Sequence, residues 1–259
     1  MLLFLKQLIK KWVPQYSFLQ RFYLGIYYMG LWGMNYGRTA DLNESGELNV
    51  LKKLKFILPD NPIFFDVGAN VGEYSILLNQ HFTNATILAF EPVKNTYDLL
   101  SQNTSHTKSI QAHHLGFGDQ NHQAEIYSSS TNSHSSMVGR AHTTTEEIHT
   151  EEIELMRLSD FVLQHKIDRI DFLKIDVEGY EINVLRGAKE LLQSKRIHCI
   201  QFEFGGTMID AHVFLKDFYH LLENNYNLYR ITKAGLYPIG SYQAHFEIFH
   251  YCNYMAILK

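Results

Sequence analysis

The stretch from Ile63 to Leu78, IFFDVGANVGEYSILL, restricts the fold of this chain more than any other part of its sequence. Its apolar start is typical of a buried strand, and the apolar residues after Gly72 recur at helical spacing. Between them, Asp66 ends the strand, and Gly68 permits a tight turn after it. The stretch therefore predicts a strand, a turn that a ligand can approach closely, and a helix.

The same alternation of strand and helix continues to the end of the chain. Helices are expected at residues 95–103, 181–194 and 212–225, and strands at residues 85–92, 110–119, 124–130, 169–176, 197–205, 226–232 and 250–258. Strands that alternate with helices form βα units on a largely parallel sheet. We therefore expect an α/β, doubly wound, Rossmann-like domain.

One stretch, from Ser128 to Glu152, interrupts this pattern. It is rich in Ser, Thr and His and poor in apolar residues, which predicts a long loop or an edge hairpin. Loops of this length in a compact domain are usually functional lids or disordered segments. A lid and a mere insertion are both compatible with the composition, so both interpretations stay open.

Length, charge and cysteine content limit the class of protein. A chain of 259 residues can form one sizeable domain with a terminal appendage. The formal net charge of −4 argues against a nucleic-acid partner, which would need a basic surface. The two cysteines, Cys199 and Cys252, both lie in apolar runs, so we expect buried thiols in a reducing, cytoplasmic compartment.

Residues 1–44 form a separate N-terminal segment before the regular pattern begins. Lysines interrupt its apolar start and no small-residue cleavage site follows, which argues against a secretory signal. The uncharged residues 22–37 are fewer than the ~20 that a membrane-spanning helix needs. We expect a helical cap or a homo-oligomer contact here. Peripheral contact of residues 1–37 with the inner face of a membrane is the alternative.

The glycine turn also indicates the kind of ligand. It reads D-x-G-x-N-x-G and lacks the G-x-G-x-x-G pattern with which nicotinamide dehydrogenases hold a pyrophosphate. Asp66 suits a positively charged ligand, and Gly68 and Gly72 allow close backbone approach. Glu91 ends the next strand, where a carboxylate can accept both hydroxyls of a ribose. Together these features indicate S-adenosylmethionine, a sulfonium on an adenosine. The alternative is a tight βα turn followed by a solvated surface acid.

Six motifs stand out along the chain: FFDVGANVGEYS, AFEPVKNTYDLLSQN, GFGD, NSHSSM, DFLKIDVEGYEINVLRGA and QFEFG. Together they resemble the FkbM family of S-adenosylmethionine-dependent methyltransferases. The run from KIDVEGYE to VLRGA is the most specific of them, because generic methyltransferases lack it. The resemblance spans residues 45–259, which we expect to form the methyltransferase domain, and residues 1–44 have no counterpart in it.

The resemblance implies a class I methyltransferase fold, with a sheet of seven strands of which the last is antiparallel. It also implies O-methylation of a hydroxyl on a sugar of a glycan, a glycolipid or a glycosylated natural product. The residues that would hold the cofactor are Asp66, Gly68 and Asn70 at its methionine and ribose side, Glu91 at the ribose, and Asp119 near the adenine amino group. A surface turn acid is the alternative for Asp119.

Methyl transfer to oxygen also needs a group that aligns the acceptor and removes its proton. Asp176 ends the strand expected at residues 169–176 and is the first candidate for this role. Glu203, near the end of the next strand, is the second, because adjacent strand ends meet at the ligand-binding edge of such a sheet. The alternative for each is a strand-end acid that caps a loop or pairs with a cation such as Lys174.

Three further residues have less defined roles. Glu178 precedes Gly179 in the turn and is a secondary catalytic candidate, whereas Glu181 lies at a helix start and is expected to be structural. His134, in the Ser-rich stretch, is either an alternative base or a solvated loop histidine. Carboxylates suit Mg²⁺, but no spacing is diagnostic of it, so no metal ligand is assigned and magnesium is not favoured.

Two other functions stay open beside O-methyl transfer. One is a non-catalytic S-adenosylmethionine-binding module that acts through its N-terminal helices, and the other is N-methyl transfer to a small molecule. Methylation of a nucleic acid is disfavoured, because the chain lacks an aromatic-flanked N/D-P-P motif for extruding a base.

Overall fold

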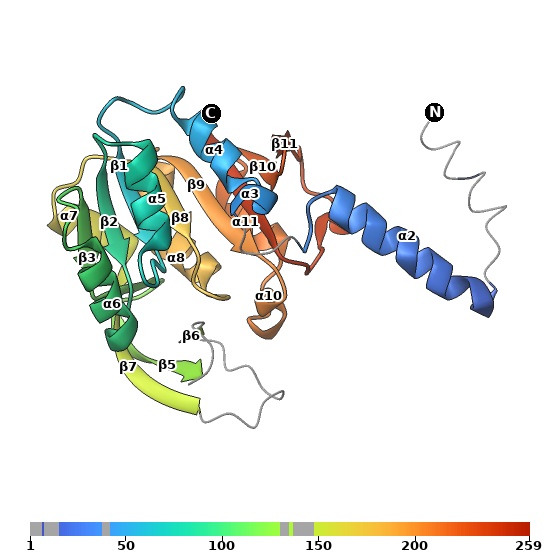
Figure 1. The fold of residues 1–259 in the computed structure, drawn as a ribbon, viewed down its shortest axis with the longest axis horizontal. Coiled ribbons are helices and arrows are strands. Elements are labelled where there is room, and N and C mark those ends of the chain that lie inside the picture. The colour runs from blue at the N-terminus through green and yellow to red at the C-terminus, as the bar shows by residue number, and fades with distance from the viewer. Residues whose placement is uncertain (1–6, 8–15, 38–41, 130–134, 137–147) are drawn as a thin grey trace.

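A computed structural model describes residues 7, 16–37, 42–129, 135–136 and 148–259 (Figure 1). Its main sheet has the strand order β11-β10-β12-β9-β8-β1-β2-β3. These strands are β1 (Ile63–Val67), β2 (Thr86–Phe90), β3 (Ile110–His113), β8 (Ile170–Ile175), β9 (Ile197–Phe204), β10 (Tyr226–Thr232), β11 (Gly235–Pro238) and β12 (Cys252–Leu258). Strands β3, β2, β1, β8 and β9 are mutually parallel, and β12 runs antiparallel between β9 and β10. The α/β, doubly wound, mostly parallel sheet expected from the sequence is confirmed.

The main sheet has one strand more than the seven expected. Strand β11 folds back on β10 in a tight hairpin, in which Thr232 lies opposite Gly235. Gly235 has a φ of 118°, which glycine adopts readily, and the Thr232 hydroxyl donates to the Gly235 carbonyl at 2.8 Å. This short hairpin adds an eighth strand at the edge of the main sheet.

A second sheet has the order β4-β7-β5-β6 and consists of β4 (Gly116–Gly118), β5 (His122–Ser129), β6 (Ser135–Ser136) and β7 (Ile148–Arg157). The expectation of one strand over residues 110–119 is thus wrong, because β3 ends at His113 and β4 joins the second sheet. Close packing on β7 holds β4 there, since a Cβ on Gly116 would meet the Leu155 side chain at 2.6 Å. Strands β5 and β7 pair antiparallel, which agrees with an edge hairpin for the described ends of residues 128–152, whereas residues 130–134 and 137–147 lie outside the described residues. The lid interpretation stays a prediction.

Helices cover both faces of the main sheet (Figure 1). One face carries α4 (Glu47–Leu54), α5 (Glu73–His81) and α6 (Lys94–Thr104), and the other carries α7 (Leu158–Gln164), α8 (Glu181–Gly187), α9 (Lys189–Gln193) and α11 (Leu215–Leu222). Neighbouring residues of β1 divide between the faces, because Phe64 packs with the first set and Phe65 with the second. The short helices are α3 (Leu42–Ser45), α10 (Thr207–Asp210) and the 3₁₀ helix η2 (Ala244–Phe246). Cys199 and Cys252 are buried free thiols in these cores, as expected.

Helix α2 (Gln20–Gly33), preceded by the 3₁₀ helix η1 (Ser17–Leu19), extends away from these layers (Figure 1). The end of α2 nearest the domain is held in place, because Leu31 and Tyr36 are buried and the Gly37 N–H donates to the Tyr251 carbonyl at 2.8 Å. The expected N-terminal helical extension is therefore confirmed. None of the helices in the described ranges is long and apolar enough to cross a membrane.

Candidate active site

The acids singled out from the sequence lie at the ends of neighbouring strands. Strand β1 pairs in parallel with β2 and β8, and β8 pairs in parallel with β9. This order brings four carboxylates to one edge of the sheet: Asp66, Glu91, Asp176 and Glu203. Doubly wound sheets bind their ligands at the carboxyl ends of the strands, so this edge is the candidate active site.

The turn after β1 is fixed by backbone contacts to both neighbouring strands. The N–H groups of Gly68 and Ala69 donate to the Phe90 carbonyl at 3.0 and 2.9 Å. The Asp176 N–H donates to the Val67 carbonyl at 2.9 Å. Gly68 has a φ of 80°, and a Cβ there would overlap the carbonyl oxygen of Asp176, so this position requires glycine. We call this contact of residues 67–68 with Asp176 the backbone joint.

Gly72 packs against a different neighbour. It has a φ of 91° and precedes α5, and a Cβ there would meet the side chains of Leu100 and Thr104 on α6 at 2.8 and 3.2 Å. Close packing of α5 on α6 therefore accounts for a glycine at this position. The assignment of Gly72 to the cofactor stays a prediction.

The carboxylate of Glu91 is held by the glycine turn. It accepts the N–H groups of Asn70 at 3.1 Å and Val93 at 3.0 Å, and only 7 % of Glu91 is exposed. Burial raises the pKa of Glu91 to about 7, although the two N–H groups act to lower it. Two residues expected to share a cofactor, Asn70 and Glu91, are thus in direct contact.

Asp66 lies inside the sheet edge. It is completely buried, accepts the Ser75 hydroxyl at 2.7 Å and lies 3.8 Å from the ammonium nitrogen of Lys174. Burial raises the pKa of Asp66, while Lys174 and Ser75 act to lower it. Its carboxylate therefore connects β1 to α5 and β8, and its contact with a cofactor stays a prediction.

Lys174 connects Asp66 to Asp176. Its buried ammonium donates to Asp176 Oδ2 at 2.9 Å and lies 4.8 Å from the centre of the Tyr74 ring. Burial acts to lower its pKa, but the carboxylates of Asp176, Asp66 and Glu47 outweigh burial and raise the pKa. The ion pair that the sequence offered as an alternative for Asp176 is therefore present. It does not enclose the acid, because 39 % of the Asp176 side chain is exposed.

Glu47 and Gln201 extend this charged centre, and the sequence does not single them out. Gln201 donates to Glu47 at 2.6 Å and accepts from the Tyr74 hydroxyl at 3.2 Å. Burial raises the pKa of Glu47, and Lys174 acts against it. A signal for part of this network exists in the sequence, because Lys174 and Gln201 are polar residues inside apolar strands, where they need partners. They lie opposite each other in the β8–β9 register.

Glu203 and Glu178 complete the acidic edge. Burial, followed by three neighbouring carboxylates, raises the pKa of Glu203 well above its ordinary value. Glu178 is half-buried in the turn after β8, with a φ of 54°. Glu181 is buried and accepts the N–H groups of Val177 and Gly179, each at 3.0 Å, which agrees with its expected structural role.

The remaining candidates are Asp119 and His134. Asp119 follows β4 and is partly exposed near Tyr180, whose pKa is raised first by burial and then by Asp119. The role of Asp119 at an adenine stays a prediction. His134 lies outside the described residues. Within the described parts of the chain, no three His, Cys, Asp or Glu side chains gather as metal ligands would.

A family model, the methyltransferase FkbM domain, matches residues 66–231, which is more than half of the chain. The chain belongs to the FkbM methyltransferase family. The matched residues of this FkbM family member contain the glycine turn, Glu91, Asp176 and Glu203. Its doubly wound sheet with the antiparallel β12 is the class I methyltransferase fold that the resemblance implied.

Known proteins similar to this FkbM family member include other methyltransferases. It is 29 % identical over 147 residues to Methyltransferase 1 of Beauveria bassiana (strain ARSEF 2860), with 50 % of this chain and 59 % of that protein covered. It is 27 % identical over 168 residues to the hexuronic acid methyltransferase AglP of Haloferax volcanii, with 65 % and 66 % covered. The chain thus spans less than two thirds of the length of these relatives. A solved structure of TrmK from M. capricolum, in complex with S-adenosyl-homocysteine, has a TM-score of 0.42 and 14 % identity, with 81 % of this chain and 67 % of that one covered.

Proposed function

We propose that this protein transfers the methyl group of S-adenosylmethionine to a hydroxyl oxygen of a sugar. The backbone joint is the observation that carries the proposal, because it fixes Asp176 directly beside the glycine turn. A donor held at the turn and an acceptor held at Asp176 would be adjacent, as an in-line displacement requires. The similarity to a hexuronic acid methyltransferase supports a sugar as the acceptor.

The residues around the turn fit this cofactor. Gly68 holds the turn against the main chain of Asp176, and the carboxylate of Glu91 suits two ribose hydroxyls. The carboxylate of Asp66 suits a positively charged sulfonium. When bound, S-adenosylmethionine supplies an electrophilic methyl group on that sulfonium. A magnesium ion is not part of the proposal.

The proposed step uses Asp176 as the base. Asp176 would accept the hydroxyl proton as the acceptor oxygen takes the methyl group, and the sulfonium would leave as a neutral thioether with the electron pair of the broken carbon–sulfur bond. The ammonium of Lys174, 2.9 Å away, stabilises the ionised carboxylate before the step. The raised pKa of Glu203 favours its protonated form, so Glu203 would orient the acceptor as a hydrogen-bond donor.

The test is to incubate the full chain with S-adenosylmethionine labelled in its methyl group, together with polysaccharides and lipid-linked sugars extracted from the source cells. Label in a methyl ether of a sugar would support the proposal. Label in an amine product would favour N-methyl transfer. Calorimetric binding of the cofactor without any transfer would favour the non-catalytic binding module.

Cofactor affinity is expected to depend on the ionisation of Glu91. Ribose hydroxyls donate to a carboxylate, so the ionised form binds more tightly, and the pKa of Glu91 is about 7. As the pH falls below 7, the Kd should rise by up to about tenfold per pH unit, and above 7 it should level off. Titration calorimetry on both sides of pH 7 measures this. Glu91→Gln should bind weakly with a flat profile, and a flat profile for the unaltered protein would contradict the role of Glu91.

A further inference from the structure

Helix α2 exposes large apolar side chains around most of its circumference. They are Phe22, Leu24, Ile26, Tyr27, Tyr28, Met29 and Trp32, with exposed fractions from 38 to 65 %. Residues 26–29 are consecutive and therefore point in directions that span most of a helical turn. Leu31 is the one residue of α2 that is buried. A helix that is apolar all round is normally covered by protein or lipid.

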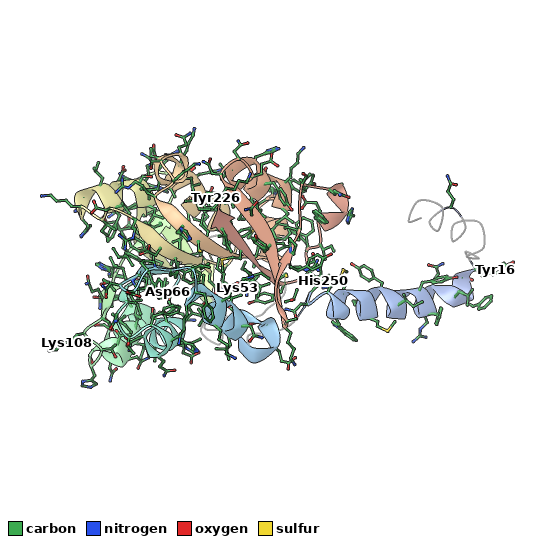
Figure 2. All side chains as sticks on the ribbon, turned by 90° about the horizontal axis from the view of Figure 1, so that it is seen from above. Tyr16, Lys53, Asp66, Lys108, Tyr226 and His250 are labelled. Atoms are coloured by element: carbon green, nitrogen blue, oxygen red, sulfur yellow. The ribbon has the colours of Figure 1, made fainter. Side chains whose placement is uncertain are left out.

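The domain holds α2 in a defined direction. The ring of Tyr28 contacts that of His250 edge-on at a centroid distance of 6.2 Å, and Figure 2 shows the helix running outward from His250 to Tyr16. This attachment lies next to the start of β12, where Cys252 pairs with Phe204 at the end of β9. Helix α2 therefore leaves the domain at the same sheet edge as the candidate active site.

The charges of the chain are divided between this segment and the rest. Residues 1–40 contain five basic residues and no acidic one, whereas residues 41–259 contain 18 basic and 27 acidic residues. The N-terminal segment of an acidic protein is thus uniformly basic. A basic segment next to an apolar helix is complementary to a surface that is negatively charged outside and apolar beneath.

We propose that α2 binds the surface of a bilayer that contains anionic phospholipids. A helix of 14 residues is too short to span the bilayer, so α2 would lie in its interfacial region. The Tyr and Trp side chains of α2 suit that region, where an apolar ring and a polar group are both accommodated. A second copy of the chain fits less well, because one partner helix would cover only one side of α2, whose exposed apolar side chains lie around most of its circumference.

The test uses the full chain and sedimentation of vesicles made of phosphatidylcholine, with or without phosphatidylglycerol. We expect binding to the vesicles with phosphatidylglycerol and weaker binding to neutral vesicles or at high salt. The double variant Phe22→Ser with Trp32→Ser should lower the fraction bound by about tenfold or more, because both side chains would lose their burial in lipid. Phe56→Ser is the matched control, since Phe56 is 88 % exposed but lies outside α2 and should bind as the unaltered chain does.

Circular dichroism and thermal unfolding of both variants show whether the domain remains folded. We expect it to remain folded, because Phe22, Trp32 and Phe56 are all exposed. Equal binding to neutral and anionic vesicles, or binding that the double variant retains, would overturn the proposal. So would an absence of binding by the unaltered chain. A concentration-dependent dimer that the double variant abolishes, seen by analytical ultracentrifugation without vesicle binding, would assign α2 to a second copy instead.

Discussion

Replacing Asp176 by Asn is expected to lower the rate of methyl transfer by roughly 100-fold or more, with little change in cofactor affinity. Asn cannot take up the acceptor proton, yet its side-chain oxygen can still accept from Lys174, so the surrounding geometry should persist. Cofactor affinity should persist because the main chain of Asp176, which the substitution does not change, contacts the glycine turn. Single-turnover kinetics with saturating cofactor, together with titration calorimetry, separate the two effects.

Asp210→Asn is the matched control for this variant. Asp210 is exposed on α10, which follows β9 at the same sheet edge, and the substitution should leave both turnover and affinity unchanged. Unaltered turnover in Asp176→Asn would remove Asp176 from the mechanism. In that case Glu203→Gln would test whether Glu203, the second candidate, is the base.

Replacing Gly68 by Ala is expected to abolish measurable cofactor binding and to lower the free energy of unfolding by about 2–6 kcal/mol. Two effects add at this position. A φ of 80° strains any residue with a Cβ, and the new Cβ would overlap the Asp176 carbonyl oxygen, so the backbone joint must open. Calorimetry measures cofactor binding, and urea unfolding measures the free energy of unfolding.

Gly235→Ala separates these two effects. Gly235 also has a positive φ, 118°, but a Cβ there would meet no atom within 4 Å, so this variant reports backbone strain without overlap. Gly235→Ala should lower the free energy of unfolding by about 1–2 kcal/mol and leave cofactor binding intact. If Gly68→Ala and Gly235→Ala lowered the free energy of unfolding equally, the overlap of a Cβ at Gly68 with Asp176 would contribute nothing beyond backbone strain.

Local sequence patterns predict most of this fold, because buried strands need apolar side chains. The apolar runs at β1, β2, β8 and β9 are covered on both faces, so each is nearly continuous and easily recognised. The break between β3 and β4 is missed because residues 110–119 read as one strand, and the packing of Gly116 on β7 is a long-range contact. Strand β11 is missed because it has four residues and none of them is buried, so it forms no apolar run.

The sequence predicts those site residues whose positions follow from the order of the strands. It does not predict the long-range hydrogen bonds and ion pairs that their side chains form. Asp176 and Glu203 follow from their positions at strand ends, because parallel strands bring their carboxyl ends to one edge. The bond between Gln201 and Glu47 joins residues 154 positions apart, so no local pattern reveals it. The burial of Asp66 is likewise a result of packing around Lys174, which is visible only in three dimensions.

The backbone joint makes the spacing between the glycine turn and Asp176 independent of the side chains around it. Main-chain atoms of Val67, Gly68 and Asp176 set that spacing, whereas the walls of an acceptor pocket would come from the loops after β8 and β9. Substitutions in those loops can therefore alter which alcohol is admitted without moving the reacting groups apart. Substrate range and chemical competence can thus change separately in evolution, so such a chain can acquire a new acceptor through intermediates that remain active.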